Sequence, residues 1–356
     1  MSALIESVRN AVGDTLFYYA VSPLAKILVL LFLIILPLIS YLTFAERKIL
    51  GYMQARLGPN RVGPWGLLQP IADVMKLLVK ADSIPTRAVK WAFILAPCLV
   101  VGPALIIFSV IPLGPPAGGG GLSWFITDVN TGLLFIVALA TVGVYGLIIG
   151  GWSSNNKFSL MGGLRSAAQM ISYEVPQGLA LVGPLLLAGS LSMVKIVEAQ
   201  KADHTWYVFP QIVAFFIYFV AGVAESNRNP FDLPEAESEL VAGYHTEYSG
   251  MRFALFFLGE YANMIVISAV ATTVFLGGWL PPFPEYLPFL AVVPGPIWFF
   301  LKISVFLFTY IWFRGTFPRY RFDQLMELGW KWLLPLALAN LAVTALVKLL
   351  LSEAPV

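Results

Sequence analysis

Two glutamates stand inside apolar stretches that are long enough to cross a membrane. Glu174 lies in the stretch 165–189 and Glu260 in the stretch 253–278. At 1.5 Å per residue, Glu174 is roughly 13 Å past Arg165, and Glu260 is about 12 Å past the basic residue that precedes its stretch. An ionisable group in hydrocarbon costs several kcal/mol and marks a functional site by default. We therefore consider both glutamates as candidates for proton transfer.

Glu225 ends a third apolar stretch, 206–225, on the same side of the membrane, and Arg228 is a candidate ion-pair partner at i+3. Each acid taken alone is also compatible with a structural hydrogen bond between helices. Three acids at one level are better explained as a proton relay, because a file of interacting carboxyl groups can pass protons and titrates as a unit.

The acidic connection 225–252 is unusual for its position. Asp232-Leu-Pro-Glu235 can begin a helix with Asp232 as its cap, and Glu239 then shares a face with Glu235, where like charges repel. A solvated loop is one interpretation. The acids alternate with apolar residues, however, on the side where positive charge is favoured. This pattern favours a docking surface or a buried proton site.

The connection 46–88 contains an amphipathic helix. Leu68, Ile71 and Met75 repeat with helical spacing, whereas Asp73 falls on the opposite side. Such a helix lies in the membrane interface. Either it rests on lipid, or it covers a cavity that an apolar ligand enters from the bilayer.

The composition sets the class of protein. Of 356 residues, 58% are hydrophobic and only 12% are charged, whereas a soluble domain carries roughly 25% charged residues. A soluble enzyme is excluded, and the net charge of +2 gives no sign of nucleic-acid binding. One cysteine, Cys98, and two histidines cannot build an iron–sulfur cluster or a thiolate zinc site.

The predicted fold is all-α, a single polytopic membrane domain over 1–356 with cytoplasmic loops at 46–88 and 225–252. Eight stretches have the length and composition of a spanning helix. They are 24–45, 89–113, 132–151, 165–189, 206–225, 253–278, 297–314 and 330–350. One set of loops holds 16 of the 22 basic residues and the other set holds six, which predicts that both termini are non-cytoplasmic. Lys302, near one end of its span, is expected to extend outward to water.

Three sequence blocks carry a resemblance to a known family. They run from Glu46-Arg47-Lys48 to Asp73, from Gly163-Leu-Arg165 to Glu174, and from Ala224-Glu225-Ser-Asn-Arg228 to Tyr248. With these blocks, over nearly its whole length, the chain resembles the H subunit of bacterial respiratory NADH–quinone oxidoreductase, complex I.

The resemblance implies a role at the junction of the membrane arm and the peripheral arm of that complex, in the bacterial inner membrane. It implies a quinone chamber near Arg47, with quinone as the substrate, and buried carboxylates at Asp73, Glu174, Glu225 and Glu260. It also implies a translocase subunit without a redox centre of its own, with FMN and iron–sulfur clusters in partner subunits. Some family members have a further carboxylate in the third span, whereas this chain has none there. A proton path must then use water, Thr141 or Tyr145.

Two alternatives remain open at this stage. The chain can also be interpreted as the equivalent subunit of a related hydrogenase or photosynthetic complex, which would differ in its soluble partners. The second alternative is a stand-alone proton channel or antiporter, but the acidic connection and the lack of an outer half-channel argue against it.

The charge asymmetry gives a testable topology. Single cysteines at Asn156 and Gly119, in a Cys98→Ser background, should be labelled from opposite sides of the membrane by an impermeant thiol reagent. We expect labelling at Asn156 from the cytoplasmic side, because the loops on that side hold most of the Lys and Arg. Labelling of both sites from one side would contradict the topology.

Overall fold

The computed structural model of the chain describes residues 22–116, 124–233, 241–282, 290 and 292–353. This part is all-helical and contains no strand, which confirms the predicted fold class. The elements in chain order are α3 (Ser22–Val29), η2 (Leu30–Ile35), α4 (Leu36–Met53), η3 (Pro64–Gly66), α5 (Gln69–Val79), α6 (Lys90–Ile107), α7 (Gly132–Ser153), α8 (Lys157–Ala188), α9 (Met193–Ala202), α10 (Ile212–Glu225), η4 (Gly243–His245), α12 (Gly250–Phe275), α13 (Gly295–Thr316), α14 (Phe322–Glu327), η6 (Leu328–Leu333) and α15 (Leu334–Glu353).

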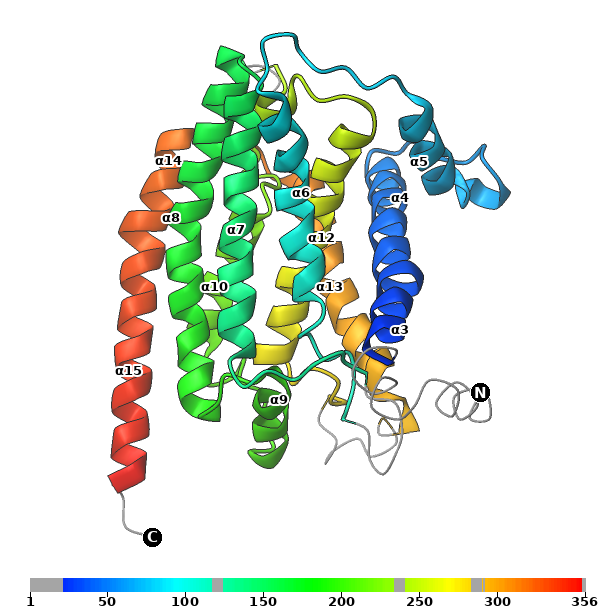
Figure 1. Ribbon diagram of the computed structural model, residues 1–356. Helices are drawn as coiled ribbons and strands as arrows, with labels where there is room; N and C mark the ends of the chain where they lie inside the picture. Colours follow the sequence, from blue (N-terminus) through cyan, green and yellow to red (C-terminus); the bar gives the residue numbers. More distant parts are fainter. Residues whose placement is uncertain (1–21, 117–123, 234–240, 283–289, 291, 354–356) are drawn as a thin grey trace.

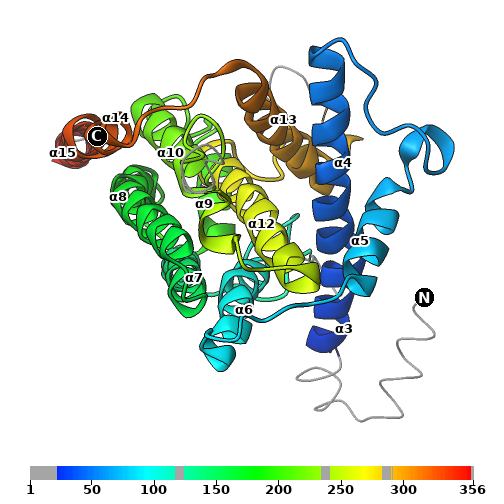
Figure 2. The ribbon, with the colours of Figure 1, turned by 90° about the horizontal axis from the view of Figure 1, so that it is seen from above.

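Helix α12 lies in the middle of the bundle. Viewed from above, it is surrounded by the other long helices, with α4 at one edge and α15 at the opposite edge (Figure 2). Nearly all of its residues from Glu260 to Phe275 are buried. In Figure 1, α5 lies at the upper end of the bundle and α9 at the lower end, and both ends of the described chain are also low. We call these the upper end and the lower end.

Within the described residues, seven helical runs are long and apolar enough to cross a membrane, so the chain is a multi-pass membrane protein. They are Pro23–Met53, Lys90–Ile107, Gly132–Ser153, Lys157–Ala188, Gly250–Phe275, Gly295–Thr316 and Phe322–Leu351. The remaining predicted span, 206–225, is helical only as α10, because the residues around Pro210 form turns.

The short length of α10 has a consequence for the segment that follows it. Its 14 residues extend about 21 Å, which is less than the roughly 30 Å of a hydrocarbon core. The chain after α10 therefore enters the bundle, and the residues from Glu225 to Arg228 are all less than a tenth exposed.

The first span is longer than the sequence pattern predicts. Its helix continues to Met53 rather than ending at 45, so Glu46 belongs to α4 and is buried, with 5% of its surface exposed. The helix continues through the charged residues that begin at Glu46, because arginine side chains inside the bundle pair with the carboxylate of Glu46.

The segment 243–249 is held against α8. A Cβ atom at Gly162 would lie 2.6 Å from the Cα of Gly243, so only glycine permits this close approach of α8 to η4. Nearby, the side chain of Asn156 caps α8 and donates a 2.6 Å hydrogen bond to Glu247. His245 of the same segment packs on α12, with its ring centre 5.3 Å from that of Phe253. The segment is therefore tied to two helices at once.

The expectation for Lys302 was wrong. Its side chain does not extend outward, and it is buried with 6% of its surface exposed. Its ammonium group instead donates to backbone carbonyl groups at and just beyond the lower end of α12.

Candidate functional site

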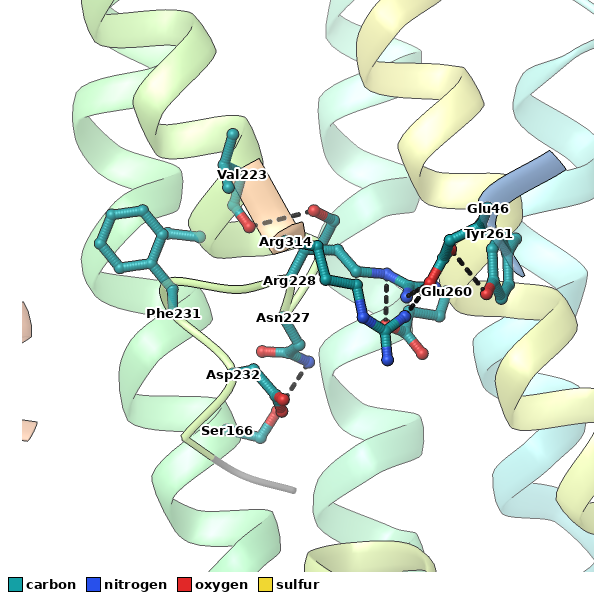
Figure 3. A network of polar contacts seen from close by, with 12 residues as sticks. Glu46, Ser166, Val223, Asn227, Arg228, Phe231, Asp232, Glu260, Tyr261 and Arg314 are labelled. Atoms are coloured by element: carbon teal, nitrogen blue, oxygen red, sulfur yellow. Dashed lines mark hydrogen bonds and ion pairs between the residues drawn. The ribbon is translucent and has the colours of Figure 1, made fainter. Parts of the chain in front are cut away.

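A buried arginine joins three parts of the chain near the upper half of α12. Nε of Arg228 lies 2.8 Å from Oε1 of Glu260 on α12, and its Nη1 lies 3.5 Å from Oε1 of Glu46 on α4. Arg314 on α13 also donates to Glu46. The hydroxyl of Tyr261 donates to the other oxygen of Glu46 at 2.9 Å. Figure 3 shows this charge network, in which two carboxylates are matched by two guanidinium groups.

The ring of Tyr261 strengthens the network from one face. The guanidinium carbon of Arg228 lies 4.2 Å from the centre of this ring, within the range of a cation–π interaction. Arg228, Glu46 and Glu260 are all less than a tenth exposed. Removing one partner from such a buried ion pair costs about 3–5 kcal/mol, because it leaves a charge without compensation.

The predicted pair between Arg228 and Glu225 was wrong. Asn227 takes a left-handed backbone conformation with a φ of +49°, and the chain turns sharply after α10. The turn directs Arg228 towards α12 and α4, whereas Glu225 lies beside Gln177 of α8.

Helix α8 fixes this turn with two polar side chains. The buried amide of Gln169 donates to the carbonyl oxygens of Ala224 and Phe231 at 2.8 and 2.9 Å, and to the side chain of Asn227 at 3.2 Å. The amide of Asn227 in turn donates to Ser166 at 3.3 Å. Side chains of α8 therefore make the hydrogen bonds that these backbone carbonyl groups would make within a regular helix.

Three cavities follow one another along α12. The uppermost has a volume of about 390 Å³ and is lined by Asp232, His245 and Glu260 among others. The second, of about 20 Å³, shares Glu260 with the first and adds Glu225 and Asn263. The third, of about 40 Å³, shares Glu225 and Asn263 with the second and adds Glu174. A water molecule needs about 10–15 Å³ of such space and two or more polar partners, so both smaller cavities can hold water.

Glu174 lies at the end of this series. The hydroxyl of Thr141 on α7 donates to Oε1 of Glu174. The third span lacks a carboxylate, and Thr141 occupies the place next to Glu174 instead. Tyr145 is 57% exposed on the outside of the bundle. Of the two hydroxyl residues considered from the sequence, it is Thr141 that contacts the glutamate.

Asp73 is separate from these acids. It lies on α5, where its carboxylate pairs with Arg47 at 2.7 Å and accepts a 2.9 Å hydrogen bond from Gln69. The apolar side chains of Leu68, Ile71 and Met75 are about half exposed. A further cavity of about 530 Å³ lies beside this segment, and its lining residues are Phe44, Lys48, Tyr52, Leu57, Gly58, Asn60, Trp65 and Leu67.

The acidic connection is only partly described. The carboxylate of Asp232 pairs with Arg319 at 2.7 Å, so that Asp232 joins this connection to the segment after α13. Glu235 and Glu239 lie outside the described residues. Among the residues that the structure does describe, no group of three or more His, Cys, Asp or Glu is placed to hold a metal ion.

Several residues of this site were not predicted from the sequence. Glu46 falls in the predicted connection 46–88, because the apolar stretch ends at residue 45, and Arg314 and Arg319 belong to the basic residues that predict the topology. Gln177 and Asn263 are single polar residues within apolar spans. Such residues carry a signal, because a buried amide in a membrane needs a partner, although the sequence does not identify that partner.

The comparisons with known proteins agree with one another. A family model described as NADH dehydrogenase matches residues 25–345. One of the H subunits of NADH-quinone oxidoreductase from Geobacter metallireducens is 50% identical over 342 residues, which cover 92% of this chain and 96% of that protein. An H subunit from Geobacter sulfurreducens is 50% identical over 348 residues, covering 94% and 97%. The H subunit from Magnetococcus marinus is 50% identical over 358 residues, covering 99% and 100%.

His245 offers a test of the upper cavity. Burial lowers the pKa of His245 from 6.5 to about 4, although Asp232 acts in the opposite direction. Protonation therefore favours unfolding, and stability is lost as the pH falls below 6.5 towards 4. At pH 5 the loss is about 2 kcal/mol.

We expect His245→Asn to remove this acid sensitivity. Native-gel analysis of the assembled complex after incubation at pH 5.0 and pH 7.5 measures the effect. The wild type should lose more assembled complex at pH 5.0 than the variant does, with equal retention at pH 7.5. Equal losses at pH 5.0 would show that His245 is not held neutral by burial.

Proposed function

Because the chain belongs to the family of H subunits of NADH-quinone oxidoreductase, whose members are membrane subunits of complex I, we propose that it forms the quinone access chamber and couples quinone reduction to proton translocation. Its partners are other complex I subunits. Within the proposal, FMN and iron–sulfur clusters in those partners deliver the electrons, and this chain holds no redox centre. The chain lies in the bacterial inner membrane with both termini on the non-cytoplasmic side.

The observation that carries the proposal is the series of cavities along α12. Each neighbouring pair of cavities shares a glutamate, first Glu260 and then Glu225, and the series ends at Glu174. A proton can then pass between carboxyl groups through one or a few water molecules. Glu225 lines two of these cavities and can accept a proton from one and release it into the other.

The carboxylates of this series differ in their surroundings. Glu260 is neutralised by Arg228. Glu225 lies beside Gln177 and Glu174, and no ion pair joins it to a cation within the described chain. Glu225 and Glu174 line the same small cavity. We infer that Glu260 and Arg228 supply a fixed charge and that Glu225 and Glu174 carry the mobile proton.

A link to quinone chemistry is offered by the upper cavity. Its volume of about 390 Å³ is in the range of ligand sites, and its walls include Arg228, Arg314 and Arg319. Guanidinium groups donate hydrogen bonds to carbonyl and anionic oxygens. A quinone that gains two electrons from the partner subunits takes up two protons, and the groups near this cavity that supply them become more negative. This change acts first on Asp232 and Glu260, because they line the same space.

Quinone enters, in this proposal, beside α5. The apolar side chains of Ile71 and Met75 on α5, and of Leu68 just before it, are about half exposed, and Arg47 and Asp73 form a polar pair next to them. Helix α5 lies at the upper end of the bundle (Figure 1). Because an isoprenoid tail is apolar, it follows the apolar side chains while the headgroup moves towards the arginines. The relatives described above, which match nearly the whole chain, are named as NADH-quinone oxidoreductase subunits. Their names favour this assignment over a hydrogenase component.

The entrance can be narrowed by one substitution. We expect Met75→Trp to slow NADH oxidation with a long-tailed quinone several-fold more than with a short-tailed one, because only the long tail still occupies the entrance during reduction. Leu338→Trp is the matched control, since Leu338 is 51% exposed on α15, far from α5 (Figure 2). Steady-state rates with both quinones provide the measurement. Equal losses for the two quinones with Met75→Trp would show that this face of α5 serves packing alone.

The relay can be tested by removing titration while keeping shape. We expect Glu225→Gln and Glu174→Gln to lower quinone reduction and proton pumping together by about tenfold or more, as expected for the loss of a proton-transfer group. Glu327→Gln is the matched control, because Glu327 is exposed and pairs with Lys331 at the surface. Electron transfer from NADH to a hydrophilic artificial acceptor should be unchanged in every variant.

Rates of quinone reduction, proton uptake and acceptor reduction in the assembled complex measure these effects. An assembled Glu225→Gln complex with normal quinone reduction and normal proton yield would remove that residue from the relay, and the same holds for Glu174→Gln.

A further inference from the structure

The lower end of α12 is held by a buried lysine. The Nζ atom of Lys302 on α13 lies 2.6, 2.9 and 2.8 Å from the carbonyl oxygens of Leu276, Gly278 and Leu280. An ammonium group has three N–H donors and no acceptor. Three carbonyl acceptors at hydrogen-bond distance therefore correspond to the charged form. The indole ring of Trp206 lies 4.5 Å from Nζ and adds a cation–π contact.

The backbone explains why a charge is tolerated at this place. The last carbonyl groups of a helix lack intrahelical partners and form the negative end of its dipole. Gly277 and Gly278 take left-handed conformations with φ of +70° and +53°, and this turn brings the carbonyl groups after α12 round the ammonium. Gln200 of α9 satisfies two further carbonyl groups of α12, those of Thr273 and Val274, at 3.0 and 3.2 Å.

Within the described chain, no carboxylate compensates the ammonium of Lys302. Asp203, three residues before Trp206, accepts a hydrogen bond from Tyr207 instead. The positive charge is balanced there by dipoles and by the face of a ring. The ammonium group of Lys302 therefore repels any other cation that approaches it.

A layer of aromatic side chains separates this cation from the lowest cavity. Phe275 of α12 lies 5.5 Å from Phe215 and 5.7 Å from Tyr218 of α10, measured between ring centres, and Phe306 of α13 lies 5.9 Å from Phe215. Tyr218 lines the cavity that holds Glu174. Phe306 follows Lys302 by four residues, about 6 Å along α13. Tyr218, Phe275 and Phe306 are at most 6% exposed.

We propose that Lys302 and this aromatic layer form a barrier that closes the lower half of the protein to protons and other small cations. In this proposal the packed rings exclude water from the space between Glu174 and Lys302 and interrupt a hydrogen-bonded chain there. The ammonium beyond them repels a hydronium or sodium ion that approaches from the lower end, in the way that fixed cations in selective pores do. The barrier goes beyond the proposed relay and is needed by it, because a relay that leaks through its far end cannot conserve energy.

Passive proton conductance of the intact complex tests the barrier. The complex is reconstituted into vesicles of phosphatidylcholine and phosphatidylglycerol without NADH, a potassium gradient with valinomycin sets the membrane potential, and trapped pyranine reports the internal pH. Lys302→Gln keeps a hydrogen-bond donor but loses the charge, and we expect it to raise proton conductance about tenfold or more. The reason is that a unit charge a few ångströms away lowers the local population of another cation by several factors of ten, even at an effective dielectric constant near 20. Lys302→Arg keeps the charge and should conduct as the wild type does.

Further variants separate the possible explanations. Glu327→Gln, at the exposed surface pair with Lys331, should leave passive conductance unchanged. The measurement uses no NADH, so failure of the barrier and failure of the relay are distinguishable. Phe306→Ala keeps the ammonium and opens the aromatic layer, and a several-fold rise in conductance is expected. If the Lys302→Gln complex does not assemble, the conductance of Phe306→Ala decides whether the barrier exists. Conductance equal to the wild type in an assembled Lys302→Gln complex, or in Phe306→Ala when that variant must decide, would overturn the barrier and leave Lys302 as a helix cap.

Discussion

The buried ion pair between Arg228 and Glu260 is the interaction on which the upper half of the bundle depends. It exists because α10 is too short to cross the membrane, so the chain turns inside the bundle and carries Arg228 to the side of α12. Glu46, on a first span that is longer than its apolar stretch, supplies the second carboxylate. Loss of one partner would leave a buried charge at a cost of about 3–5 kcal/mol, and the contact between the helices that meet there would weaken.

This arrangement divides the buried acids into two kinds. Glu46 and Glu260 face guanidinium groups, whereas Glu225 and Glu174 share a small cavity that contains amide and hydroxyl groups but no described cation. Helix α12 passes through both regions. Its upper half carries Glu260 beside Arg228, and its lower end is capped by Lys302. A charge change at the upper cavity thus acts on a helix whose far end is fixed.

The sequence predicts the helices of this fold well and their partners less well. Hydropathy predicts eight spans, and seven of them are long apolar helices in the described chain, because the length and composition of a span are local properties of the sequence. That Glu174 and Glu260 lie inside long helices follows from the apolar stretches alone. The partner of Arg228 does not, because the turn at Asn227 depends on hydrogen bonds from Gln169, which lies 58 residues earlier. The position of Lys302 was wrongly predicted for a similar reason, since the glycine turn that receives it follows another helix.

In the proposed function, the central step is a change in the protonation of Glu225 when quinone is reduced. Redox-induced infrared difference spectroscopy of the whole complex measures it directly, through the stretching band of a protonated carboxyl group. We predict a difference band in the wild type that is retained in Glu327→Gln and lost or shifted in Glu225→Gln and Glu174→Gln. A band that is identical in all four proteins would contradict the assignment of the mobile proton to this pair of glutamates.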